Sequence, residues 1–333
     1  MKAWVCNAFG EVPQWVDVPD LAPSVLQPGQ VLIDVAACGV NFADTLILKG
    51  KYQKRPEGPF SPGFEVSGTV RAIGDGVSNV KPGDAVMAMP DWGGYAEQVV
   101  ADACLVMPLP DGVDFNSAAA FQIAYGTSWF ALKYRADVKP GEIVLVHGAA
   151  GGVGLTAVEC AKLLGATLIA TAGGVDKCQI ARDHGADHVI DYKSENIRDR
   201  VREITASLGQ PKGVDVVYDP IGGDVFDQSL RCVAPGARML LIGFASGTVP
   251  QIPANILLVK NVTAIGFYFG AYLEQNPDIA QAGMAELLGR LKSGAIRPMI
   301  SAVYRLEDAM DALASIRDRT ATGKLVIDCR PNR

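Results

Sequence analysis

The chain has 333 residues, 49% of them hydrophobic and 20% charged, which excludes a disordered or collagen-like protein and predicts about two domains. Thirty Lys and Arg residues against 36 Asp and Glu residues give a net charge of -6. Because no global positive field attracts nucleic acid or an anionic membrane surface, we expect neither as a partner.

No stretch approaches the roughly 18 apolar residues of a membrane span, and the N-terminal residues lack the apolar core of a signal peptide. The 7 cysteines are scattered without a C-x-x-C pair, which predicts free thiols in a reducing, cytoplasmic environment. Only 3 histidines occur, which argues against a His-rich metal centre.

Short β-like runs separated by Gly and Pro turns dominate the chain up to about residue 120, a pattern typical of a compact, strongly curved β domain. Helical spacing interrupts this pattern twice. We expect strands at 31–40, 64–74, 84–90 and 94–108, a helix at 41–49 and one or two helices over 115–132.

From about residue 140 to 270, continuous apolar strands alternate with amphipathic helices, which predicts a buried, doubly wound parallel sheet. The expected strands are 142–148, 167–174, 188–192, 214–219, 237–244 and 261–267, and the expected helices are 152–165, 176–185, 197–207 and 224–232. The remaining chain predicts helices at 278–291 and 306–316 and a strand at 323–329.

A glycine-rich loop joins the first of these strands directly to a helix. Read as A-x-G-x-x-G, it supplies a tight turn, close backbone approach to a pyrophosphate and close packing of helix on strand. The context of strand, loop and helix predicts a dinucleotide site rather than a turn with only a packing role. Its candidate residues are Gly148, Ala149, Gly151, Gly152, Val153 and Gly154.

The end of the second strand predicts which dinucleotide binds. An NAD site places an acid there, and this chain has Ala172, Gly173 and Gly174. Lys177 lies just beyond and Tyr192 ends the next strand, so a cation and a phenol could reach a 2′-phosphate. We therefore expect NADPH, although Lys177 alone would also suit the solvated first turn of a helix.

Taken together, the motifs resemble the medium-chain dehydrogenase/reductase superfamily, in its zinc-free quinone oxidoreductase branch. They are AACGVNFADTLILKGKY, PGFEVSGTV, VKPGDAVMA, GGYAEQVV, AYGTSWFAL, AAGGVG, GADHVIDY, VDVVYDPIGG and GKLVI. The resemblance implies an α/β chain with a discontinuous GroES-like catalytic domain, 1–122 and 271–333, around a Rossmann cofactor domain, 123–270. It also implies a homodimer joined at the edge strand 261–267.

Zinc enzymes of this superfamily carry a Cys and a His ligand where this chain has Asn41 and Phe64, within Gly63-Phe64-Glu65. A three-ligand catalytic zinc cannot be assembled from these residues, and we expect no metal. Without a Lewis acid, reduction of an activated C=C bond or a quinone is favoured over alcohol oxidation. The resemblance implies hydride transfer from NADPH to such an acceptor, a small molecule.

The resemblance also implies roles for individual residues. Asn41 matches the polar group near the nicotinamide ribose or substrate carbonyl, Asp44 lies one turn along, and Tyr52 is a candidate donor to the acceptor oxygen. Further cofactor contacts are implied for Thr127, Gly243, Phe244, Ser246, Phe267 and Phe269.

Two other functions stay open. A reductase of enoyl- or acryloyl-CoA thioesters would use the same hydride step, and four basic residues could anchor coenzyme A phosphates: Lys49, Lys51, Lys54 and Arg55. Alternatively, the chain could bind NADPH as a structural or sensory ligand without turnover.

Overall fold

The computed structural model describes residues 1–330, and the chain divides into two compact units. The first unit combines Met1–Ile123 with the chain from Leu288 onward, and the second unit is Ala124–Leu287. The first boundary lies one residue from the one we expected, but the second lies after Leu287 rather than after residue 270.

The later boundary has a clear packing reason. Helix α10 (Pro277–Lys292) rests on the segment after α3 (Gln122–Trp129): a Cβ placed on Gly283 would lie 2.4 Å from Phe130 Cζ. Lys133 Nζ also lies 2.5 Å from Glu286 Oε2. These contacts keep most of α10 in the second unit. They depend on tertiary packing, which the composition of the segment does not indicate.

The second unit is built on a six-stranded sheet with the order β10-β9-β8-β11-β12-β13, in which every pair is parallel. This is the doubly wound order, with the direction of winding reversing between β8 and β11. The strands are β8 (Ile143–Val146), β9 (Thr167–Ala172), β10 (His188–Asp191), β11 (Val214–Asp219), β12 (Val233–Leu241) and β13 (Thr263–Gly266).

The helices of this unit follow the strands in the expected alternation. Contacts place α4 against β8 and β9, α5 against β9 and β10, and α8 against β12. Their bounds are α4 (Gly152–Leu163), α5 (Val175–Asp183), α6 (Ile197–Ser207), α7 (Asp224–Leu230), α8 (Ala254–Lys260) and α9 (Phe269–Gln275).

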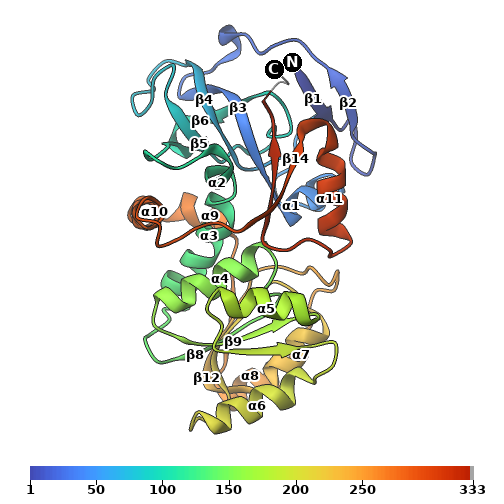
Figure 1. The fold of residues 1–333 in the computed structure, drawn as a ribbon, viewed down its shortest axis with the longest axis vertical. Helices are drawn as coiled ribbons and strands as arrows, with labels where there is room; N and C mark the ends of the chain where they lie inside the picture. The colour runs from blue at the N-terminus through green and yellow to red at the C-terminus, as the bar shows by residue number, and fades with distance from the viewer. Residues whose placement is uncertain (331–333) are drawn as a thin grey trace. The chain divides into compact units, whose positions relative to one another are not determined.

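The first unit contains a seven-stranded, mostly antiparallel sheet with the order β14-β15-β3-β4-β5-β7, and β6 also pairs with β3. These strands are β3 (Gln30–Val40), β4 (Val66–Ile73), β5 (Ala85–Ala88), β6 (Gln98–Asp102), β7 (Val106–Pro108), β14 (Ile300–Arg305) and β15 (Lys324–Asp328). Figure 1 shows the last segments of the chain, in red, beside β3 and α1 (Phe42–Ile47), in blue. The tail therefore completes a sheet that the first third of the chain begins.

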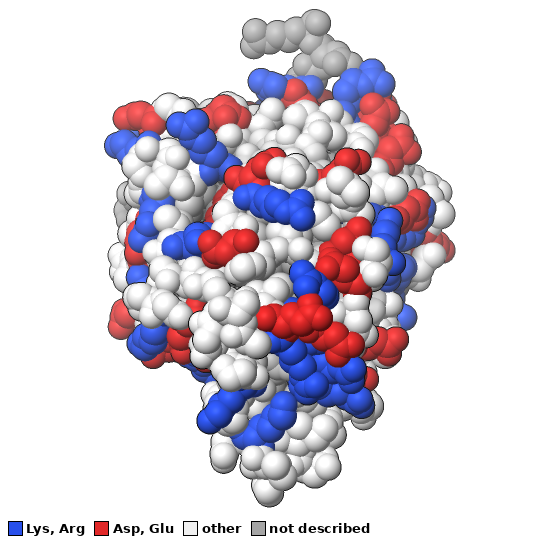
Figure 2. All heavy atoms as spheres, turned by 60° about the horizontal axis from the view of Figure 1, so that its bottom comes forward, with Lys and Arg blue, Asp and Glu red and all other residues white. Residues whose placement is uncertain are grey.

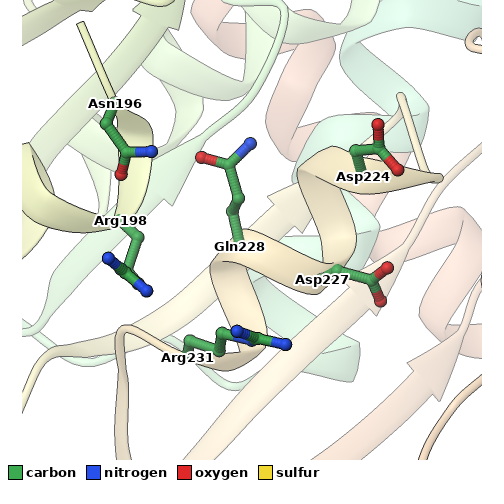
Figure 3. A pocket seen from close by; sticks show the side chains of 6 residues that line it. All are labelled: Asn196, Arg198, Asp224, Asp227, Gln228 and Arg231. Carbon is green, nitrogen blue, oxygen red and sulfur yellow. The ribbon is translucent and has the colours of Figure 1, made fainter.

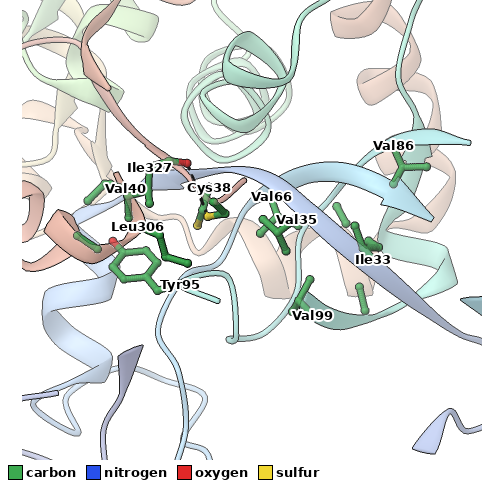
Figure 4. Close-up of a cluster of buried hydrophobic side chains, with 14 of the residues drawn as sticks. Ile33, Val35, Cys38, Val40, Val66, Val86, Tyr95, Val99, Leu306 and Ile327 are labelled. Atoms are coloured by element: carbon green, nitrogen blue, oxygen red, sulfur yellow. Dashed lines mark hydrogen bonds between the residues drawn. The ribbon is translucent and has the colours of Figure 1, made fainter. Parts of the chain in front are cut away.

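The core of the first unit lies along β3. All its residues except Gln30 and Asp34 are buried, so it reads as a continuous apolar run. Figure 4 shows side chains of β3 packed with others from β4, β5, β6, β15 and the turn at Leu306. Helices α2 (Phe115–Ala119) and α11 (Ala309–Arg317) also contact strands of this sheet.

Several elements differ from the expectations. The stretch 115–132, expected to form one or two helices, contains two, α2 and α3, and continues into a π-helical segment, Phe130–Arg135, which was not expected. The expected run 94–108 is two strands joined by a 3-10 turn, Ala103–Leu105. The structure also contains β1 (Lys2–Val5), β2 (Gln14–Asp17), β14, α8 and α9, which the sequence analysis did not assign.

Within residues 1–330, no helix combines the length and apolar character needed to cross a bilayer. All 7 cysteines are free thiols, and only Cys104 is exposed. Figure 2 shows acidic and basic side chains interleaved over the face that it draws.

Candidate functional site

The glycine loop lies at the carboxyl end of β8. Gly148 has a φ of 61°, in the left-handed region that favours glycine, and Gly151 donates its N–H to Gly148 O at 2.9 Å. A Cβ on Gly154 would lie 2.1 Å from Gly148 O, so α4 packs against the loop at a distance that only glycine permits. Ala149 N donates to Thr171 O at 3.0 Å and ties the loop to β9.

Helix α4 begins at Gly152, with Gly151 as its N-cap. Amides in the first turn of a helix have no acceptor within the helix, and here they belong to Gly152, Val153 and Gly154. Gly152 and Val153 are half-buried rather than covered. This backbone concavity at a helix N-terminus fits the pyrophosphate of a dinucleotide.

Two lysines and a tyrosine gather at the ends of β9 and β10. Tyr192 is 50% exposed, and its hydroxyl would lie 2.5 Å from a Cβ on Gly173, so the ring covers that glycine. Burial, followed by the charge of Lys193, lowers the pKa of Lys177 below its ordinary value. A phosphate dianion placed beside both ammonium groups would relieve their mutual repulsion. No acid stands at the end of β9 itself, and the nearby Asp191 carboxylate already accepts from Gly174 N at 2.9 Å and from Lys193 N at 3.0 Å.

The loop after β12 packs on the loop after β11. Ser246 N donates to Ile221 O at 2.9 Å, and a Cβ on Gly222 would lie 3.0 Å from Phe244 Cδ1. Phe244 is 37% exposed, and Gly243 is half-buried. In a parallel sheet both loops share the carboxyl edge with the glycine loop, as expected for a ligand-lining surface.

The two phenylalanines after β13 that were predicted to contact the cofactor are almost fully buried. Phe267 and Phe269 are each 8% exposed, and their ring centroids lie 6.4 Å apart. Phe269 covers Gly126, where a Cβ would lie 2.3 Å from Phe269 Cζ, next to Thr127 on α3. Phe269 thus packs against α3 and Phe267 packs against Phe269, and their contact with a cofactor stays a prediction.

Asn41, at the start of α1 in the first unit, lies in a buried polar cluster. Its Nδ2 donates to Glu65 Oε1 at 2.9 Å, and its Oδ1 accepts from Lys324 Nζ at 2.8 Å. Lys324 Nζ in turn lies 2.5 Å from Glu65 Oε1. The side chain of Asn41 is only 8% exposed and is oriented by a full positive and a full negative charge.

Asp44 is completely buried and accepts hydrogen bonds on both oxygens. Oδ2 accepts from Asn41 N at 2.7 Å and from the Tyr95 hydroxyl at 3.2 Å, and Oδ1 accepts from Gly63 N at 3.0 Å. Burial raises the pKa of Asp44 to about 7 despite these donors. This placement favours a role in fixing the backbone at Asn41 and Gly63 over direct contact with a substrate.

Tyr52 packs its ring against Phe64, with centroids 4.8 Å apart, beside Ile47 and Trp92. It is half-buried, so part of the side chain remains accessible. The structure therefore gives Tyr52 an apolar surrounding, and its role as a donor stays a prediction.

The donor set at this position does not fit a catalytic zinc. Phe64 offers no ligand atom, and Glu65 is already paired with Lys324. Across residues 1–330, no three His, Cys, Asp or Glu side chains gather in an arrangement suited to a metal ion. At this position, Phe64 and the paired Glu65 therefore do not supply the ligand set of a catalytic zinc.

Sequence reasoning missed three charged residues of these sites, Lys193, Glu65 and Lys324. Lys193 directly follows Tyr192, the last residue of the motif GADHVIDY, so its place in the sequence was the signal for a second cation at this site. Glu65 and Lys324 lie in the motifs PGFEV and GKLVI. Glu65 directly precedes β4 and Lys324 is the first residue of β15, so each places a charge at the start of a buried strand. That break in an apolar run was the available signal.

A separate cleft of about 340 Å³ lies between α6 and α7 (Figure 3). Its lining residues carry both signs of charge, and none of them is a predicted site residue. They are Asn196, Arg198, Asp224, Asp227, Gln228 and Arg231.

Comparison with known families matches both halves of the chain. The model of the alcohol dehydrogenase GroES-like domain matches residues 27–111, and the model described as zinc-binding dehydrogenase matches residues 152–287. The first match lies in the first unit and the second match in the second unit.

Individual relatives extend over almost the whole chain. Quinone oxidoreductase-like protein 2 of Bos taurus is 37% identical, over 99% of this chain and 97% of its own length. The synaptic vesicle membrane protein VAT-1 homolog of Homo sapiens is 32% identical, over 94% of this chain and 82% of its own length. Among solved structures, quinone oxidoreductase of Escherichia coli complexed with NADPH is 32% identical, with a TM-score of 0.90 over 98% of this chain and 100% of that one.

Proposed function

Because the chain belongs to the quinone oxidoreductase type of the medium-chain dehydrogenase/reductase superfamily, we propose that it transfers a hydride from NADPH to a quinone or another α,β-unsaturated carbonyl. The observation that carries the choice of cofactor is the pair of cations after β9 and β10, Lys177 and Lys193, together with the absence of an acid from Ala172, Gly173 and Gly174 at the end of β9. The acceptor class is inferred from the relatives and from the absence of a fitting zinc ligand set within residues 1–330.

When bound, NADPH supplies the hydride, and the polypeptide supplies orientation and exclusion of water. The first-turn amides of α4 and the loop at Gly148 would hold the pyrophosphate, with Lys177, Lys193 and Tyr192 at the 2′-phosphate. Gly243, Phe244 and Ser246 would line the adenosine path. In the first unit, Asn41 and Tyr52 would meet the acceptor or the nicotinamide ribose through hydrogen bonds.

Steady-state NADPH oxidation tests this proposal directly. We expect turnover with a naphthoquinone to exceed turnover with crotonyl-CoA and acryloyl-CoA, compared by kcat/KM. A higher kcat/KM with the thioesters would refute the quinone as the acceptor and favour a CoA thioester instead. The structure weakens the thioester alternative in one respect, because Lys54 of the basic run is paired with Asp91 at 2.8 Å.

NADPH binding without turnover on any acceptor would instead favour the sensory or structural alternative. Stopped-flow oxidation of bound NADPH, measured with a panel of quinones and enones, separates the two cases. We also propose that catalysis is zinc-independent. Metal analysis after purification without added metal should find less than about 0.1 zinc per chain, a level too low for a resident catalytic ion.

We further propose a homodimer formed along β13. This strand ends the order of the parallel sheet, so one of its edges has no neighbour within that sheet. Leu258 and Val259 on the preceding helix α8 are 76% and 77% exposed, as expected for residues that a second copy would cover. Sedimentation should give a dimer, and Leu258→Asp with Val259→Asp should shift it to a monomer.

A further inference from the structure

The ammonium group of Lys324 is buried among three oxygen atoms. Lys324 begins β15, and its Nζ lies 2.5 Å from Glu65 Oε1, 2.8 Å from Asn41 Oδ1 and 3.2 Å from Val40 O. The Lys324 and Glu65 side chains are only 3% and 0% exposed. An ammonium has three N–H donors, and all three have acceptors here, so Lys324 has no proton left for a ligand.

Glu65 completes the arrangement. Its Oε1 accepts from Asn41 Nδ2 at 2.9 Å, and its Oε2 accepts from Ile123 N at 2.9 Å. The two ends of the Asn41 amide therefore meet opposite charges: the oxygen faces the ammonium and the nitrogen faces the carboxylate. Turning the amide over would place nitrogen against ammonium and oxygen against carboxylate, which electrostatics strongly opposes.

The amide keeps little capacity for other partners. Asn41 Nδ2 has a second N–H for Gly39 O, which lies 3.4 Å from Nδ2, and Oδ1 has a second lone pair. The orientation of the amide thus decides whether a ligand meets a donor or an acceptor at a given point.

We propose that Lys324 and Glu65 are positioning residues that hold the Asn41 amide in a single orientation for hydride transfer. This inference rests on the proposed function, in which Asn41 meets the acceptor or the nicotinamide ribose. Lys324 acts only through Asn41, because its own protons are all used.

Three variants test the proposal: Glu65→Gln, Lys324→Met and the double variant. In Glu65→Gln, the amide oxygen of the new glutamine keeps the hydrogen bond from Ile123 N. Its Nε2 therefore faces Asn41 Nδ2 and Lys324 Nζ, which are also donors, so the hydrogen bonds to both are lost. In Lys324→Met, the Glu65 carboxylate loses its cation. The double variant removes both charges and allows Asn41 to turn over and accept from Gln Nε2.

Each single variant should lower the melting temperature by about 10 °C, because a buried charge or donor loses its partner. The double variant should recover most of this loss. Its kcat for the quinone should nevertheless stay roughly 10- to 100-fold below that of the native chain, while the KM for NADPH changes by less than about twofold. A purely structural pair would recover kcat together with stability, and that outcome would overturn the proposal.

Side-chain amide spectra of protein labelled with ¹⁵N-asparagine read the orientation without any need for activity. The Asn41 proton that meets Glu65 should shift in the double variant, with the signal assigned by its loss in Asn41→Ser. An unchanged Asn41 signal would refute the orientation lock. If none of the acceptors tested supports NADPH oxidation by the native chain, the proposed function fails. The spectra still show whether Lys324 and Glu65 fix the orientation of the Asn41 amide.

Trp4→Phe is the matched control. It removes another hydrogen bond of the first unit, partly buried, from Trp4 Nε1 to Leu306 O at 2.7 Å, and neither residue is among the hydrogen-bond partners of Asn41, Glu65 or Lys324 given above. It should lower stability while leaving both the Asn41 signal and kcat unchanged. A comparable fall in kcat with Trp4→Phe would show that general destabilisation explains the variants, and would overturn the proposal.

Discussion

Replacement of Lys177 by alanine should separate NADPH from NADH. Lys177 lies in the first turn of α5, half-buried, and close enough to Lys193 for the charge of Lys193 to lower its pKa. NADH has no 2′-phosphate, so the same substitution removes nothing from its binding. The variant therefore tests the predicted phosphate contact and little else.

The expected magnitude follows from burial. A hydrogen bond to a charged group contributes roughly 1.5–3 kcal/mol, and half-burial puts Lys177 near 2 kcal/mol. That corresponds to an increase of about 30-fold in the Kd for NADPH. Lys193 is exposed, so Lys193→Ala should cost less than about 1 kcal/mol, or roughly fivefold.

The assay is fluorescence titration of NADPH and NADH at one fixed ionic strength, because phosphate contacts weaken with salt. Lys139→Ala is the control: this lysine is 61% exposed, pairs with Asp137 and precedes β8, at the opposite end of the strand from the glycine loop. We expect no change in either Kd. Equal losses for NADPH and NADH in Lys177→Ala would refute the phosphate role.

Three further outcomes are expected. Gly154→Ala should lower the free energy of unfolding by about 2–3 kcal/mol and weaken NADPH binding, because the new Cβ would meet Gly148 O. Urea unfolding measures the first effect and fluorescence titration the second. An unaltered affinity for NADPH would contradict the role of the loop. The raised pKa of Asp44 means that its stabilising contribution is present below its ordinary pKa and is lost as pH rises through about 7. The free energy of unfolding should therefore fall by up to about 1.4 kcal/mol per unit between pH 4 and 7, and Asp44→Asn should flatten that slope; identical slopes would count against it. In the native state Cys104 should react with a thiol reagent much faster than the buried cysteines, and fast release of several thiols would contradict their burial.

The parallel-sheet fold of the second unit could be predicted from the sequence because its signals are local. A continuous apolar strand, a glycine loop and a helix occur within about 20 consecutive residues, and each step has a backbone reason. The same holds for the absence of an acid after β9. The order of the sheet then follows from right-handed connections between parallel strands.

The sequence indicated Asn41 as a site residue but not its charged partners, because these partners are distant from it in the chain. Lys324 and Glu65 are separated by 259 positions, and no local pattern links them. Short strands such as β2 and β14 were missed because every residue in them is half-buried or exposed, which leaves little apolar signal. The boundary after Leu287 depended on packing of Gly283 against Phe130, which composition does not encode.

The position of β15 in its sheet has a consequence for synthesis. This strand lies between β14 and β3, yet it follows the entire second unit in the chain. As the polypeptide leaves the ribosome, the second unit has all its strands available before the first unit can close its sheet. Lys324 arrives with β15, so Asn41 acquires its cationic partner only at this last step. A chain interrupted before β15 could still bind a nucleotide, but its Asn41 would lack that partner.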